Sequence, residues 1–243
     1  MSSLAFLSPG PGALAKSPME PGAAAAGAVF EERGGWKVAV SFPGESFAAV
    51  GFADLSHLGK IEVQGDVAAI TGKQLELGTA VRSEGAWWCP YSPTRAVVLC
   101  EPGNTAALRD HLTASVADAN GLASVIDITA AQGAMTILGP FAREVFARFT
   151  AIDLRPQVTP VHAWRPGSVA RTGGAILCEA PDRYLMLFGA ALGQYVWQTV
   201  ADAAEHLGGG PVGVDALSPL DVRAASSDGA GPADGSSPEA PHA

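Results

Sequence analysis

The sequence is poor in charged residues and in cysteine, and it has no long apolar run. Charged residues make up 16% of its 243 positions, and 24 acidic against 15 basic residues give a formal net charge of −9. Because no cluster of lysine and arginine offsets this charge, we expect neither nucleic acid nor an anionic membrane as a partner. No apolar stretch approaches the roughly 20 residues of a membrane-spanning helix, and no secretory leader is recognisable. The sequence therefore predicts a soluble, cytoplasmic protein.

The few cysteines exclude a disulfide framework. Cys89, Cys100 and Cys178 form no Cys-x-x-Cys pair and have no histidine at metal-ligand spacing. An odd number of cysteines at irregular spacing does not fit a stapled secreted domain. We expect three free thiols, buried or partly buried in a reducing compartment, and no metal site.

Both ends of the chain are rich in glycine, alanine, proline and serine. We expect residues 1–35 to be a flexible arm, 36–220 to be the folded domain and 221–243 to be a disordered tail, because the two ends hold little apolar material to offset the entropy of ordering. The arm has two open interpretations: a solvated extension, or a segment that becomes ordered against a partner subunit. Apolar residues that could anchor it recur at intervals: Met19, Val29, Phe30 and Trp36.

The middle of the chain contains an internal repeat. "GKIEVQGDVA" begins at Gly59 and "GAMTILGPFA" at Gly133, an offset of 133 − 59 = 74 residues, and both read Gly-x-apolar-x-apolar-x-Gly-x-x-Ala. "FADLS" precedes the first copy and "VIDIT" the second. Two similar units can pair their strands and bury their helices across a pseudo-twofold axis, as symmetric oligomers do between chains.

Hydrophobic periodicity predicts strands and helices in irregular order. Strands are expected over 36–42, 59–64, 96–100, 123–129 and 133–139 and on both sides of a turn at 180–183, and helices are expected after Asp66 and over 105–120, 140–150 and 191–207. The strand over 59–64 is predicted to be half-buried, with Ile61 and Val63 inside and Lys60, Glu62 and Gln64 outside. This order favours an α+β fold with helices packed on largely antiparallel sheets.

Three stretches carry a resemblance to a known family. They are "GFADLSHLGKIEVQGDVA", "VIDITAAQGAMTILGPFA" and "GSVARTGGAILCEAPDRYLMLFGAALGQYVWQTVADAAEHLGGGPVGVDAL". In this order the chain resembles the folate-dependent aminomethyltransferase superfamily, which includes the T-protein of the glycine cleavage system. Within it the chain is most similar to the gamma subunit of heterotetrameric sarcosine oxidase. That likeness takes in "AKSPME" and "GAVFEERGGW" and extends from about Lys16 to Leu217.

The resemblance implies an aminomethyltransferase-like folate-binding fold with two similar strand-strand-helix halves. For a gamma-type subunit it implies a heterotetrameric complex that oxidatively demethylates sarcosine and passes the one-carbon unit to tetrahydrofolate. The larger flavoprotein and aminomethyltransferase-like subunits would then carry the FAD, FMN, NAD and tetrahydrofolate sites. This chain would have no catalytic residues, and the sequence assigns it no cofactor-binding residues.

Departures from the T-protein favour a subunit without an active site. Trp87, Trp88, Cys89 and Pro90 stand where the T-protein has an aspartate before the strand that matches "RAVVL", and Trp and Cys cannot replace a carboxylate in acid–base work at neutral pH. The stretch after Arg171 lacks the acids of the T-protein's Gly-Glu-Asp motif. After "GPVGVDAL" the T-protein continues into a second domain, whereas this chain runs into its tail, so we expect one wall of a folate pocket to be missing.

Two alternatives stay open. One is a stand-alone tetrahydrofolate-binding aminomethyl- or methyltransferase, and the other is a scaffold of this fold that serves an unrelated partner. Asp54 and Asp127 occupy matching places in the repeat, which raises the idea of paired catalytic carboxylates. Their repetition instead favours turns closed by side-chain hydrogen bonds. His57 and Ser56 have no acid or nucleophile motif beside them and are interpreted as structural.

Two further motifs have competing interpretations. "GGGPVG" over 208–213 follows a helix and does not begin one, so we interpret it as a helix stop and not as a phosphate loop. Trp87 and Trp88 are adjacent in a strand and must point to opposite faces. One would enter the core, and the other, beside Pro90 and Tyr91, would face outward as the centre of a protein interface. The alternative is that the N-terminal arm covers both.

Overall fold

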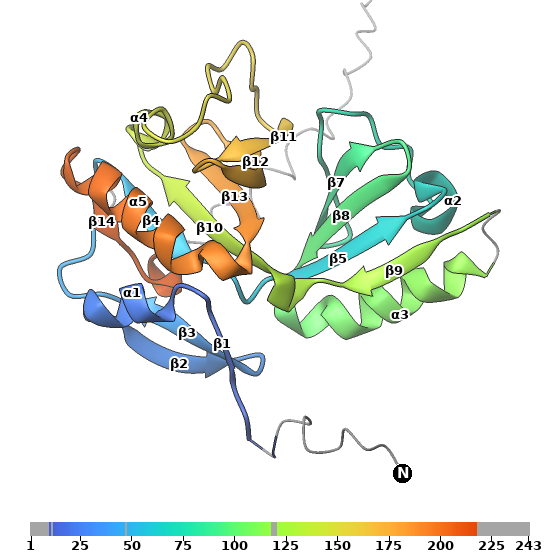
Figure 1. The fold of residues 1–243 in the computed structure, drawn as a ribbon, viewed down its shortest axis with the longest axis horizontal. Helices are drawn as coiled ribbons and strands as arrows, with labels where there is room; N and C mark the ends of the chain where they lie inside the picture. The colour runs from blue at the N-terminus through green and yellow to red at the C-terminus, as the bar shows by residue number, and fades with distance from the viewer. Residues whose placement is uncertain (1–9, 11, 47, 118–120, 218–243) are drawn as a thin grey trace, which may run out of the picture.

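The computed structural model describes residues 10, 12–46, 48–117 and 121–217. Figure 1 shows two large sheets side by side, with a small three-stranded sheet next to the six-stranded one. The small sheet has the order β1-β3-β2 and consists of β1 (Ala15–Lys16), β2 (Val29–Arg33) and β3 (Trp36–Ser41). The helices are α1 (Glu20–Ala25), α2 (Val67–Thr71), α3 (Thr105–Val116), α4 (Ala142–Phe146) and α5 (Gly193–Glu205). Within those ranges no helix is long and apolar enough to cross a membrane.

The two large sheets are almost wholly antiparallel. The six-stranded sheet has the order β11-β12-β13-β10-β4-β14, from β4 (Gly51–Asp54), β10 (Gln132–Leu138), β11 (Trp164–Val169), β12 (Thr172–Ala180), β13 (Arg183–Gly189) and β14 (Gly210–Pro211). The five-stranded sheet has the order β6-β7-β8-β5-β9, from β5 (Gly59–Gln64), β6 (Val81–Ser83), β7 (Ala86–Ser92), β8 (Arg95–Cys100) and β9 (Ser124–Asp127). Among the described residues of these two sheets, the one parallel pair is β14 with β4, and in the small sheet β1 pairs in parallel with β3. The predicted α+β class is confirmed.

The repeat pairs with itself across the centre of the molecule. In the first copy, β4 lies in the six-stranded sheet and β5 in the five-stranded sheet. In the second copy the order is reversed, because β9 lies in the five-stranded sheet and β10 in the six-stranded sheet. Asp54 lies opposite Met135, and Asp127 lies opposite Ile61. Since 127 − 54 = 73 and 135 − 61 = 74, these two pairs are images of each other under the repeat. The predicted pseudo-twofold pairing is therefore confirmed strand by strand.

Three apolar clusters form the core. One lies on the outer face of the six-stranded sheet under α1, α4 and α5, a second lies between the two large sheets, and a third lies under α2 and α3. The cysteines contribute one thiol to each cluster, and all of them are free and buried, as expected. Burial of apolar area in these layers is the main driving force for the fold.

The N-terminal segment corrects the expectation of a flexible arm through residue 35. Residues 15–33 form β1, α1 and β2, and Met19 is fully buried against the outer core cluster. A Cβ atom on Gly22 would lie 2.3 Å from Cδ1 of Trp197, so α1 packs directly on α5. Lys37 also donates to Glu20 at 2.6 Å. Met19 and Phe30 thus pack against the core of the same chain, whereas Val29 is 55% exposed. Residues 1–9 and the predicted tail over 221–243 lie outside the described residues.

The strand over 59–64 is buried on both faces, which corrects its prediction as half-buried. Ile61 and Val63 face α3, as expected, but Lys60 is 0% and Glu62 8% exposed. The alternation of apolar and polar residues predicted correctly which side chains share a face of the strand. It did not predict that the second face is buried as well. That face lies against the six-stranded sheet, which the periodicity of a single strand cannot reveal.

The helix predicted over 140–150 is shorter than expected. α4 covers only Ala142–Phe146, and Phe141 just before it is 43% exposed. The chain leaves the helix early because Thr150 forms a β-bridge with Val169 and donates its hydroxyl to the carbonyl of Ser168 at 2.7 Å. In contrast, α3 and α5 lie within their predicted ranges and begin within two residues of the predicted starts.

We predict that Met19→Ala lowers the free energy of unfolding by about 2–5 kcal/mol, the usual cost of removing a fully buried methionine. Urea denaturation followed by circular dichroism measures it. Leu14→Ala is the matched control, because Leu14 is partly exposed in the same segment. A Met19→Ala variant as stable as the control would mean that α1 does not contribute to the core.

Candidate functional site

A cleft with a volume of about 440 Å³ opens between the two large sheets. The crossing from β4 to β5 supplies its floor through Leu55, His57 and Leu58. Its walls come from both sheets and from the segment after α5: Arg33, Arg82, Gly85, Ala86, Trp87, Leu99, Cys100, Glu101, Pro102, Glu179, Arg183, Leu185, Val214 and Leu217. The site therefore exists only because the two copies of the repeat cross at this point.

Arginines on three different strands line this cleft, and one of them lies over an indole. The guanidinium of Arg82 lies 5.3 Å from the centre of the Trp87 ring, a cation–π distance. Arg183 lies 3.1 Å from the carboxylate of Glu179, and Arg33 lies 2.6 Å from that of Asp215. An apolar aromatic wall with guanidinium groups at its rim suits a flat ligand that carries a carboxylate.

His57 connects this cleft with a neighbouring hollow beside Trp36 and Asp127. Burial lowers the pKa of His57 to about 4, and the nearby charges of Lys60 and Arg33 act in the same direction. The imidazole is therefore neutral at neutral pH. It can exchange hydrogen bonds with a ligand, but it supplies no positive charge.

The two aspartates of the repeat close equivalent turns. Oδ1 of Asp54 accepts from the amide of Ser56, and Oδ1 of Asp127 accepts from the amide of Thr129, both at 2.9 Å. Burial raises the pKa of Asp54, and its hydrogen bonds with Ser17 and Ser56 oppose that shift. These contacts fit the interpretation of both residues as turn formers.

The residues that follow the aspartates link the two copies reciprocally. The hydroxyl of Ser56 accepts from the amide of Ala134 at 3.2 Å, and that of Thr129 accepts from the amide of Lys60 at 3.0 Å. Since 129 − 56 = 73 and 134 − 60 = 74, these are again the same bond made twice. The interpretation of Ser56 as a structural residue is consistent with this bond.

Lys60 is a buried cation at the crossing that sequence reasoning missed. Its ammonium donates to the carbonyls of Ser56 at 2.9 Å and Leu58 at 2.8 Å. Burial lowers the pKa of Lys60 to about 8, while the carboxylates of Asp54 and Asp127 oppose that shift. The repeat could have indicated that this position is buried, because the second copy has Ala134 where the first has Lys60.

The tandem tryptophans are both buried, which corrects the prediction of an outward-facing interface residue. They point to opposite faces of β7, as expected: Trp87 lies in the cluster between the sheets and Trp88 in the cluster under α2 and α3. The alternative of a cover by the N-terminal arm is also wrong, because the second sheet and the helices cover them. Tyr91 is half-buried, with its ring 5.3 Å from that of Trp164.

The remaining candidates are turn residues. Arg171 is exposed in the β11–β12 hairpin, where both Ala170 and Arg171 have positive φ angles of 49° and 63°. "GGGPVG" ends α5, and Gly209 and Gly213 leave no room for a Cβ because backbone oxygens of Val50 and Val40 would lie 2.2 and 1.9 Å from it. Among the described residues no group of His, Cys, Asp and Glu could hold a metal ion.

Comparisons with solved structures find this arrangement elsewhere. A chain of the heterotetrameric sarcosine oxidase from Corynebacterium sp. U-96 superposes with a TM-score of 0.63 and 20% identity, over 79% of this chain and 95% of that chain. The glycine cleavage system aminomethyltransferase T from Bartonella henselae superposes with a TM-score of 0.67 and 17% identity, over 84% of this chain. The fold is that of the aminomethyltransferases.

These similarities establish the fold, and the identities are too low to carry more. The match spans only 60% of the Bartonella henselae enzyme. No family model matches the sequence, and the comparison with curated proteins gives no match.

We predict that His57 lowers the free energy of unfolding in mild acid. Its pKa is about 4 in the folded state against 6.5 for an ordinary histidine, so between these values the unfolded chain binds a proton that the folded chain does not. Stability conferred at neutral pH is then lost as the pH falls from 6.5 towards 4, by about 1–3 kcal/mol. Urea denaturation at a series of pH values measures the slope.

The control is His57→Gln, which removes the titrating group and should flatten that part of the profile. His206→Gln is the matched variant, because His206 is exposed at the end of α5. Equal slopes for the wild type and His57→Gln would contradict the prediction.

Proposed function

We propose that the chain is a non-catalytic, gamma-type subunit of a complex similar to heterotetrameric sarcosine oxidase. The observation that carries the proposal is the extent of the structural match, which includes 95% of the sarcosine oxidase chain. A part of a larger enzyme would be matched over a smaller share, as the aminomethyltransferase T is. The complex would demethylate sarcosine oxidatively and transfer the one-carbon unit to tetrahydrofolate.

The site supports a role without chemistry. Asp54 and Asp127 are engaged in turns, and Glu179 is paired with Arg183. His57 is neutral and partly buried. Catalysis of aminomethyl transfer needs a group that moves a proton at the folate nitrogens, and these side chains are held by structural contacts. FAD, FMN, NAD and tetrahydrofolate would be bound by the larger subunits, which this chain would brace.

Co-purification from the native cells tests the proposal. We expect the tagged chain to recover larger subunits in fixed stoichiometry, with the visible absorption of a flavin in the eluted complex. Size-exclusion chromatography with subunit identification gives the composition. A colourless chain that elutes alone would contradict the proposal.

A stand-alone tetrahydrofolate-binding transferase is the second candidate, and the central cleft favours it. Trp87 would face the flat ring system and Arg82 would hold a carboxylate, which is the chemistry that this cleft offers. When bound, tetrahydrofolate supplies the nitrogens that accept a one-carbon group. The described residues supply binding and orientation.

Calorimetric titration of the isolated chain with tetrahydrofolate separates the two candidates. For a gamma-type subunit we expect no saturable binding. Saturable binding that Arg82→Ala weakens by tenfold or more would instead support the transferase. Arg109→Ala is the control, because Arg109 is exposed on α3 and is not part of the cleft.

A further inference from the structure

The last described residues of the chain form part of the wall of the central cleft. Val214 and Leu217 line the cleft, and both pack against the apolar cluster between the two large sheets. The described part of the chain ends at Leu217, and 243 − 217 = 26 residues follow it in the sequence. The continuation of the chain therefore starts at the cleft itself.

The point where the chain leaves the cleft wall is held by polar contacts. The amide of Gly213 donates to the carboxylate of Glu45 at 2.8 Å, and Arg33 at the end of β2 lies 2.6 Å from the carboxylate of Asp215. Gly213 and Asp215 precede Leu217 by four and two residues. These contacts fix the position of Leu217, so the residues after it begin at a defined place.

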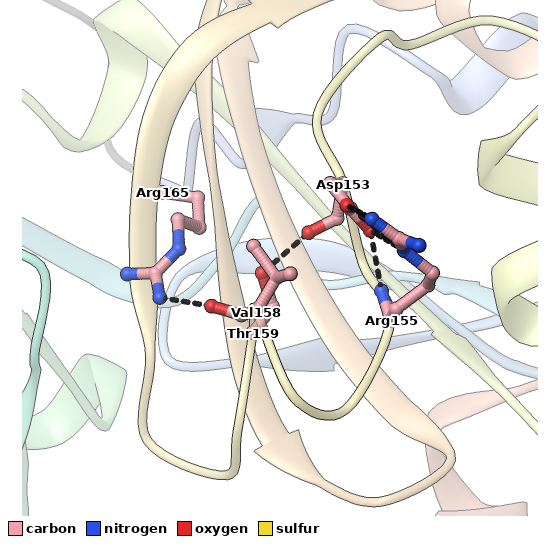
Figure 2. Close-up of polar contacts among 5 residues, drawn as sticks. All are labelled: Asp153, Arg155, Val158, Thr159 and Arg165. Atoms are coloured by element: carbon pink, nitrogen blue, oxygen red, sulfur yellow. Dashed lines mark hydrogen bonds and ion pairs between the residues drawn. The ribbon is translucent and has the colours of Figure 1, made fainter.

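The wall of the cleft that contains Trp87 is held in place as well. The ring of His162, in the connection between α4 and β11, lies 5.2 Å from that of Trp87. Figure 2 shows how this connection keeps its shape, because Arg165 reaches back from β11 to the carbonyl of Val158 at 2.6 Å. Arg165 also donates to the carbonyl of Gly78, at 2.6 Å, in the segment before β6. An occupant of the cleft would therefore lose little free energy in ordering this wall.

The sequence after Leu217 contains two large apolar residues and then none. It continues as "SPLDV" over 218–222, with Leu220 and Val222, and after that it has no Leu, Ile, Val, Met, Phe, Tyr or Trp. Pro219 disfavours a helical conformation for the residue before it, and in an extended segment Leu220 and Val222 point to the same side. Five extended residues span at most about 18 Å, so these two side chains can reach only surfaces close to Leu217.

The central cleft offers an apolar surface within that reach. Leu55, Leu58, Trp87 and Leu185 line the cleft and belong to the cluster between the sheets or pack against it. The cleft volume of about 440 Å³ lies in the range of roughly 300–1,000 Å³ that is usual for ligand pockets. Two apolar side chains in this cleft would exchange contact with water for contact with leucine and indole, which is favourable.

We propose that residues 218–222 dock in the central cleft of their own chain, with Leu220 and Val222 against its apolar lining. The segment is tethered at Leu217, so its effective concentration at the cleft is high and docking needs no second molecule. It would occupy the space that a flat ligand needs, and the isolated chain would keep its cleft closed. The proposal concerns the cleft alone and does not rest on the gamma-type role.

The test measures access to a thiol placed in the cleft of the full chain by Leu58→Cys. Leu58 lines the cleft, whereas the native cysteines are buried. We expect the further change Leu220→Ser/Val222→Ser to raise the rate of labelling by dithiobis(nitrobenzoate) about tenfold or more, because the segment no longer covers the thiol. The matched control is Ala225→Ser/Ala240→Ser, which changes two residues beyond 218–222 and should leave the rate unchanged. Circular dichroism and the melting temperature check that each variant is folded.

A second measurement needs no added cysteine. Of the five tryptophans of the chain, Trp87 lines the cleft. We expect acrylamide to quench the tryptophan fluorescence of Leu220→Ser/Val222→Ser more strongly than that of the wild type, because Trp87 becomes accessible. The control Ala225→Ser/Ala240→Ser should be quenched like the wild type.

The outcomes separate the docking of the segment from the proposed function. Equal labelling rates with and without Leu220→Ser/Val222→Ser would overturn the proposal. A rate that rises equally in the control would overturn it too, because the effect would then not belong to residues 218–222. Both measurements use the isolated chain, so their failure leaves the gamma-type role standing, and co-purification tests that role separately.

Discussion

The structure depends on the reciprocal pairing of two copies of one short motif. Each copy sends its first strand into one sheet and its second strand into the other, so β4 pairs with β10 and β5 with β9. The turns that make this crossing possible are closed by Asp54 and Asp127 in the same way. Neither sheet could be completed by one copy alone, which ties the folding of the two halves together.

Crossing strands leave polar backbone groups at the centre of a buried layer, where unpaired groups are costly. The ammonium of Lys60 satisfies carbonyls of the first crossing, and hydroxyls of Ser56 and Thr129 bind amides of the opposite copy. The cleft opens because the two large sheets diverge from this crossing.

The structural roles of these central residues agree with the proposed bracing subunit. The carboxylates of Asp54 and Asp127 hold turns, and Trp87 is buried between the two large sheets. The N-terminal segment closes the outer face of the six-stranded sheet by packing α1 on α5.

The sequence by itself determined the α+β class, the free thiols, the pairing of the repeat and the turn role of the aspartates, because local patterns and a 74-residue offset encode them. Tertiary structure alone decided what covers each surface. Lys60 and Glu62 alternate like exposed residues, yet the second sheet buries them. The burial of Met19 and Trp87 likewise depends on residues far along the chain. Burial is a property of what packs on a face, and periodicity reports only which residues share that face.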